Sequence, residues 1–179
     1  MRRLGFFLLT FAMTLALAGP VAAAGPSGQG ASDTPLGSYD ILITSDVGCA
    51  GFDVMVEDIS GRITDIYMGV DGRGYERFST QFRTVTRYTR YDSETGEPTA
   101  QSFTSPFHSL ANYAIAPDGT VTVRWANSLL AWAPEVQAMG LSDGIWLIEK
   151  GSGWIEYGLT ETTAKLNNGR LTNVCDLLS

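Results

Sequence analysis

The segment SLANYAIAPDGTVTVRWA (residues 109–126) decides the fold, because it contains two β-strand patterns on either side of a tight turn. The turn is the Pro-Asp-Gly tripeptide at 117–119, in which proline fixes its own backbone angle and glycine accepts a left-handed one. After the turn, Val121, Val123 and Trp125 share one face, with polar residues between them. The segment therefore predicts an antiparallel hairpin with one buried face.

The same signals recur on both sides of this hairpin. Short segments rich in Thr, Val, Ile, Tyr and Phe are bounded by turn residues such as Asp71-Gly72. A further turn is predicted at Gly151-Ser152-Gly153, joining the last strand pair. About eight or nine strands at regular spacing predict an all-β fold. We expect an antiparallel meander that forms a closed or nearly closed barrel, with a sandwich as the alternative and a short C-terminal helix within LTNVCDLLS (residues 171–179).

The N-terminal residues predict export. Two arginines precede the apolar run LGFFLLTFAMTLALAG, and two alanines then stand in the A-x-A arrangement of a cleavage site. We predict a signal peptide over residues 1–24, a flexible linker over 25–37 that is rich in glycine, proline and serine, and a single β-domain over 38–179. The alternative is a retained membrane anchor. The predicted location is secreted, either extracellular or periplasmic.

The charge balance limits the partners. The chain has 12 basic and 19 acidic residues, a formal charge of −7. Removal of the signal peptide would leave 10 basic residues against 19 acidic ones, a charge of −9. Such a protein is not expected to bind nucleic acid or an anionic membrane. No segment indicates a cofactor, and the oligomeric state is open.

The two cysteines lie near opposite ends of the predicted domain, at Cys49 and Cys175. In an exported protein, two thiols most simply pair with each other. The bond would close a loop of roughly 125 residues, which stabilises the fold by about 4–5 kcal/mol through loop-closure entropy. A metal site is the weaker interpretation, because two cysteines and one distant histidine lack a recognisable ligand spacing.

Several motifs together resemble a known family. These are CAGFDV, an Asp-Gly turn, a Thr-Gly hairpin, a PDGT hairpin and a final GRLTNVCDLL. Their placement is similar to that in a family of uncharacterised, small, exported bacterial β-domain proteins. The resemblance covers nearly the whole predicted domain. It implies the same architecture and a Cys49–Cys175 bond that clamps the terminal segment, and it implies no catalytic residue.

Two sets of side chains are candidates for binding. Large aromatics can line an apolar pocket or a carbohydrate-binding face, although they also fill the core of β-domains. Arginines concentrated in one segment can bind phosphate, sulfate or carboxylate, although they also pair with acids on neighbouring strands. The aromatic candidates are Trp125, Trp132, Trp146 and Trp154, and the candidate anion patch is Arg83, Arg87 and Arg90.

Catalytic signals are weak. GLSDG at 140–144 matches the G-x-S-x-G elbow around Ser142, but a strand pattern follows it where the elbow needs a helix. His108 is the only histidine and could act as a general base beside a carboxylate. No segment has the spacing of a calcium loop or another metal site. A hydrolase that uses His108 is therefore only an alternative, and we assign no catalytic residue.

These observations predict an exported, non-catalytic β-domain that binds a partner or ligand. The first hypothesis is a small apolar ligand inside the barrel, because about eight strands can enclose one. The second is a glycan, held by exposed aromatic side chains.

Overall fold

A computed structural model describes residues 30–179, so the predicted signal peptide and the first part of the predicted linker lie outside the described residues. The described chain is all-β except for two one-turn helices, α2 (Glu135–Ala138) and α3 (Val174–Leu177). Its strands are β1 (Gly30–Thr34), β2 (Ile41–Ile43), β3 (Phe52–Val70), β4 (Glu76–Asp92), β5 (Pro98–Ile115), β6 (Val121–Ala131), β7 (Trp146–Tyr157) and β8 (Thr162–Asn173).

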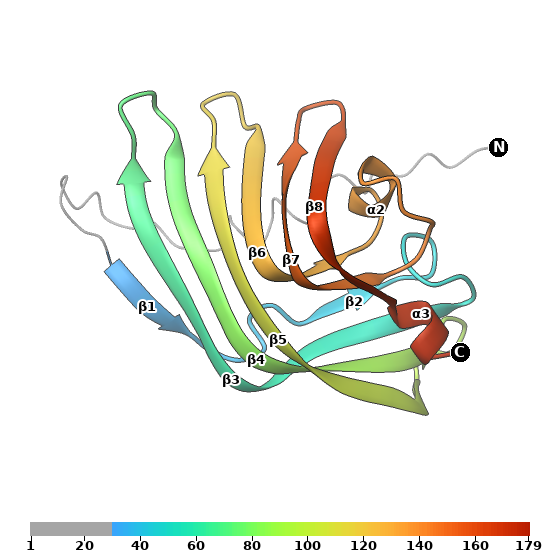
Figure 1. The fold of residues 1–179 in the computed structure, drawn as a ribbon. Coiled ribbons are helices and arrows are strands. Elements are labelled where there is room, and N and C mark those ends of the chain that lie inside the picture. Colours follow the sequence, from blue (N-terminus) through green and yellow to red (C-terminus); the bar gives the residue numbers. More distant parts are fainter. Residues whose placement is uncertain (1–29) are drawn as a thin grey trace.

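The strands form one antiparallel sheet in the order β1-β3-β4-β5-β6-β7-β8 (Figure 1). The short strands β1 and β2 pair with different parts of the same edge of β3. From β3 to β8, each strand pairs with the next one in the chain, which is the predicted meander. The hairpin at 109–126 is confirmed, with Ile115 opposite Val121.

Three strands are much longer than the sequence pattern predicts, because β3, β4 and β5 each join two predicted strands. The long strands curve strongly in the middle (Figure 1). A β-bulge between Asp58 and Ser60 lies in this curved region. Bulges bend a strand without ending it. Next to it, Gly61 has φ +112°, and a Cβ there would lie 2.2 Å from the backbone oxygen of Arg83. Glycine is therefore required where the strands curve.

The sheet is not closed into a barrel, which corrects the predicted closure. Within residues 30–179, no backbone pairing joins β8 to β1 or β2. Closure by hydrogen bonds needs long edges, and β1 and β2 have only five and three residues. In addition, α2 packs against β8.

A disulfide instead joins the segment before β3 to the C-terminal helix. Cys49 precedes β3 and Cys175 lies in α3 after β8, and the two are bonded across a sequence separation of 126 residues. The prediction of this bond is confirmed. Around it lies the main hydrophobic core, to which β2, β3, β4, β7 and the C-terminal residues contribute. Its buried members are Ile43, Cys49, Phe52, Val54, Val56, Tyr88, Ile145, Leu147, Val174 and Leu178. We call this the closed end of the sheet.

At the other end of the long strands the concave face is more exposed. There the β1–β2 turn, the C-terminal half of β3 and the start of β4 present Tyr39, Asp65, Tyr67 and Phe78. We call this the open end. β1 belongs to the segment 25–37 that the sequence pattern predicts as a linker, so the described sheet begins before the predicted boundary at Ser38.

One predicted turn is wrong. Gly151, Ser152 and Gly153 lie inside β7, not between two strands. The glycines are there because of close packing: a Cβ on Gly153 would lie 2.2 Å from the backbone oxygen of Lys165 and 3.0 Å from the ring of Trp125. The predicted C-terminal helix is confirmed as α3, with Val174 buried. Across residues 30–179, no helix has the length and hydropathy of a transmembrane span.

Candidate functional site

The open end contains a hollow of about 300 Å³ on the concave face. Its walls come from β1, the β1–β2 turn, β3 and the start of β4. We call it the aromatic hollow and define it by its lining residues, which are Gly30, Ser32, Tyr39, Asp65, Ile66, Tyr67, Glu76 and Phe78.

Strand alternation and register place the key side chains together. Asp65 and Tyr67 are two residues apart on β3 and so point to the same face. In the pairing of β1 with β3, Ser32 lies opposite Asp65 and Gly30 lies opposite Tyr67. Because Gly30 has no side chain, it leaves the neighbouring Tyr67 ring uncovered, and this residue is 43% exposed. The hollow therefore results from a short edge strand that covers β3 only partly.

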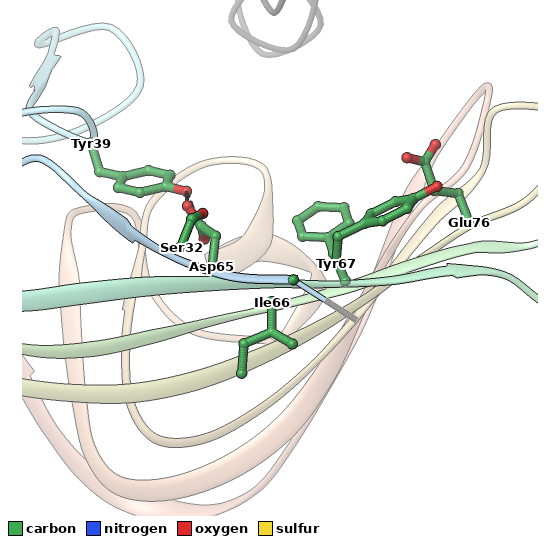
Figure 2. A pocket seen from close by; sticks show the side chains of 8 residues that line it. Ser32, Tyr39, Asp65, Ile66, Tyr67 and Glu76 are labelled. Carbon is green, nitrogen blue, oxygen red and sulfur yellow. Dashed lines mark hydrogen bonds between the residues drawn. The ribbon is translucent and has the colours of Figure 1, made fainter. Parts of the chain in front are cut away.

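Figure 2 shows the arrangement from close by. Tyr39 and Tyr67 rise from the same side of the sheet at opposite ends of the hollow. Ser32 and Asp65 lie next to Tyr39, and Glu76 lies next to Tyr67. An aromatic ring and a carboxylate are thus present at each end.

Hydrogen bonds fix the carboxylate of Asp65. It accepts from the hydroxyl of Thr80 at 2.6 Å, from Tyr39 Oη at 3.0 and 3.1 Å, and from the hydroxyl of Thr34. Asp65 in turn holds the Tyr39 ring at the rim of the hollow, so both groups are preorganised.

Burial and the negative charge of Asp65 raise the pKa of Tyr39 to about 12. Burial likewise raises the pKa of Tyr113, which lies opposite Phe78 on β5, to about 12. Both phenols therefore remain protonated at neutral pH and act as hydrogen-bond donors. The rings are also braced, since Phe78 stacks on Tyr113 with 4.4 Å between centroids and Tyr39 meets Phe82 edge to face at 5.2 Å.

The charged side chains that line the hollow are all acidic. Its charged residues are Asp65 and Glu76, and no lysine or arginine of the described chain lines it. Carboxylates only accept hydrogen bonds, so the hollow offers acceptors to a ligand that carries hydroxyl or ammonium donors. It disfavours a ligand that is itself an anion.

A second carboxylate is buried elsewhere in the molecule. Glu135 in α2 is 7% exposed and accepts a hydrogen bond from Tyr157 Oη at 2.8 Å. Burial raises the pKa of Glu135. Burial, followed by the charge of Glu135, also raises the pKa of Tyr157. Because Glu135 is almost fully enclosed, this pair joins α2 to the sheet and does not line the hollow.

The structure does not bring the four tryptophans into one site. Trp125 is buried beside Gly153, and Trp154, the next residue after Gly153, points to the other face of the sheet. Trp132 packs on the core of the closed end. Trp146 donates from Nε1 to the backbone oxygen of Ser142 at 2.9 Å. Whether any of them binds a ligand stays a prediction.

The three arginines of the expected anion patch are also dispersed. Arg87 pairs with Glu57 across β3 and β4 at 3.0 Å. The guanidinium of Arg90 lies 4.4 Å from the ring centroid of Phe52 and donates to the backbone oxygen of Leu178. Arg83 is exposed on the other half of β4. Arg87 and Arg90 therefore take part in local structural contacts, and Arg83 lies apart from both.

The residues considered for catalysis are apart from the hollow. His108 is exposed within β5, and its partner on β4 is Arg83, not a carboxylate. Ser142 lies between α2 and β7, and the segment that follows it is a strand. Residues 30–179 contain no group of three or more His, Cys, Asp and Glu side chains arranged to hold a metal ion.

Sequence reasoning missed the hollow. Tyr39 and Ser32 lie at or beyond the predicted edge of the domain, and only the register of β1 brings them to Asp65. The alternating pair Asp65 and Tyr67 was the one available signal, since it places a carboxylate and an aromatic ring on one strand face.

Comparisons with protein-family models, with curated proteins and with solved structures found no match to this chain. They therefore identify no family, and the resemblance noted from the motifs is supported only at the level of an all-β domain whose near-terminal cysteines, Cys49 and Cys175, are joined.

Proposed function

We propose that this protein is a non-catalytic binding domain that works in an oxidising compartment and holds a glycan in the aromatic hollow. The observation that carries this proposal is the pairing of two exposed tyrosine rings with a carboxylate that three hydroxyl groups hold in place. The disulfide supports the choice of compartment, since such bonds persist outside the reducing cytosol.

The chemistry of a sugar ring matches that of the hollow. One face of a pyranose carries C–H groups that pack on an aromatic ring, here Tyr67 or Tyr39. Its hydroxyl groups donate hydrogen bonds, and Asp65 and Glu76 supply ionised acceptors, which form the stronger class of hydrogen bond. A volume of about 300 Å³ is at the lower end of the range for ligand sites. The hollow therefore suits a small unit, such as one sugar of a chain that continues into solvent.

The wholly apolar ligand expected from the sequence is less compatible with this site. It would cover the carboxylate of Glu76 without offering a donor, whereas Asp65 would keep the three donors it already has. Burying a polar group without a hydrogen bond costs about 1–3 kcal/mol by protein mutational data, and more for a charge. The barrel interior imagined for such a ligand is also not formed, because the sheet is open.

The negative charge of the hollow narrows the class of glycan that we propose. Asp65 and Glu76 would repel the carboxylate of a uronic acid. We therefore expect a preference for neutral or amino sugars over sugars that carry an acid group.

The test is isothermal titration calorimetry with short oligomers of glucose and of N-acetylglucosamine, and with an oligomer of galacturonic acid as the anionic comparison. We expect saturable binding of a neutral oligomer. Tyr67→Ala should weaken it about tenfold through loss of the stacking surface. Tyr91→Ala is the matched control, since Tyr91 lies on β4 at the closed end and should leave the affinity unchanged. Absence of binding to every oligomer, or equal binding by Tyr67→Ala and the unaltered protein, would contradict the proposal.

A further inference from the structure

A second candidate site lies directly behind the aromatic hollow, on the convex side of the same strands. Ile63 and Asp65 point to the concave face, so their neighbours Arg62 and Thr64 point the other way. Across the β3–β4 pairing, Arg62 lies opposite Arg83 and Thr64 lies opposite Gln81. These four residues line a cavity of about 230 Å³, which we call the arginine niche.

The niche places like charges side by side. Residues directly opposite each other in an antiparallel pair have Cβ atoms only about 4.5–5.5 Å apart, and like charges at such positions destabilise the sheet. On the far side of β4, Arg83 is also paired with His108 of β5. Three basic side chains therefore form one row across β3, β4 and β5, in a chain with a net charge of −7.

Counter-charges for this row are scarce. Arg62 forms an ion pair with Asp33 at 2.7 Å, but the two side chains are 68% and 64% exposed, and pairs this exposed contribute little. Arg83 has no acidic partner among residues 30–179. Arg77, Arg87 and Arg170 each have one, in Asp71, Glu57 and Glu149. Within residues 30–179, Arg90 and Arg124 form no such ion pair either, so what distinguishes Arg83 is that a second arginine, Arg62, lies directly opposite it.

The lining of the niche completes a donor set. No carboxylate lines it, while the Thr64 hydroxyl and the Gln81 amide are neutral donors. Guanidinium groups present several N–H donors in a planar fork that matches the oxygens of phosphate and sulfate. An oxyanion between Arg62 and Arg83 would offset their repulsion and gain charge-assisted hydrogen bonds from both.

We propose that the arginine niche binds a tetrahedral oxyanion, a phosphate or sulfate group, between Arg62 and Arg83. Thr64 and Gln81 supply neutral hydrogen bonds, and His108 adds a donor at the β5 side of Arg83. The group is either a free anion or one carried on a sugar. This site faces away from the aromatic hollow and does not depend on the function proposed for it.

The experiment is a titration of the isotope-labelled protein, followed by NMR, with inorganic phosphate and with inorganic sulfate at low ionic strength. Sodium chloride at matched ionic strength is the reference. We expect saturable shifts at Arg62, Thr64, Gln81 and Arg83 with the oxyanions and none that saturate with chloride. Arg83→Gln should weaken the affinity about tenfold, as expected for loss of a charge-assisted hydrogen bond.

The matched control is Arg87→Gln, which removes the same charge from the same strand face but at a residue that pairs with Glu57. It should retain the affinity within about twofold.

A further titration with N-acetylglucosamine 6-sulfate separates a free anion from one carried on a sugar. Tighter binding than inorganic sulfate, still lost in Arg83→Gln, assigns the group to a sugar, whereas equal binding assigns a free anion. The proposal is wrong if neither oxyanion gives saturable shifts at the niche, or if Arg83→Gln and Arg87→Gln weaken binding equally. Because Tyr67→Ala leaves the niche intact, failure of one site is distinguishable from failure of the other.

Discussion

The closed and open ends of this sheet are built from the same strands but have different surroundings. On β3, Val54 is fully buried at the closed end, whereas Tyr67 at the open end is 43% exposed. At the closed end, Leu147 of β7 and Leu178 after α3 pack with the buried side chains of β3 and β4. At the open end, the short strand β1 leaves the concave face accessible. The comparison shows that a meander can be held shut at one end by a core and a disulfide, without closing by hydrogen bonds, and can keep its other end free for a ligand.

Of the changes considered, removal of the disulfide is expected to have the largest effect on the stability of the closed end. The double variant Cys49→Ala/Cys175→Ala releases a loop spanning 126 residues, and the loop-entropy relation gives a loss of about 4–5 kcal/mol in the free energy of unfolding. Urea unfolding followed by circular dichroism measures it. A loss below about 1 kcal/mol would show that the core alone holds the closed end.

One substitution made at both ends of β3 tests the comparison directly. Val54 is fully buried and Val70 is 64% exposed. Val54→Ala removes two methyl groups from the core and should cost about 2 kcal/mol, whereas Val70→Ala should stay within about 0.5 kcal/mol. The midpoints of urea unfolding give both values. Equal effects of the two substitutions would mean that the open end is packed as tightly as the closed one.

The smallest expected effect on stability comes from substitution of Glu135, whose carboxylate is buried. Its pKa is raised by burial, so the folded state binds this proton more tightly than the unfolded chain does. The stability that this group contributes is therefore fully present below its ordinary pKa of 4.5 and is lost as the pH rises through the raised value.

Glu135→Gln removes this dependence, because the amide stays neutral and its oxygen can still accept from Tyr157. We expect the melting temperature of the variant, relative to the unaltered protein, to increase from pH 4 to pH 7. Asp71, Asp92 and Asp118, whose pKa values are lowered by hydrogen bonds, are present in both proteins and cancel in the difference. A difference that is constant with pH, or that falls, would contradict the assignment.

The sequence was informative where the signal is local. The alternation of Val121, Val123 and Trp125 and the turn at 117–119 predict the hairpin that the structure contains. The placement of Cys49 and Cys175, in a chain whose N-terminal pattern predicts export, predicts their bond. These features depend on neighbouring residues or on chemistry that does not require the fold.

The pairing register between strands that are distant in the sequence could not be predicted. Gly153 looks like a turn residue, and only the approach of Trp125 and Lys165 shows why a glycine stands inside β7. The failure of the sheet to close is linked to the short edge strands β1 and β2, whose lengths the sequence pattern does not predict. The hollow was missed for the same reason, since Ser32 meets Asp65 through pairing between segments more than 30 residues apart in the chain.

Chemical-shift mapping of the isotope-labelled protein, titrated with an N-acetylglucosamine oligomer, tests the central claim most directly. If the open end is the binding site, the shifts that saturate will cluster at Ser32, Tyr39, Asp65 and Tyr67 and will leave Val54 and Leu178 unchanged. No saturable shift with this oligomer or its glucose counterpart, or shifts centred on the closed end, would contradict the account.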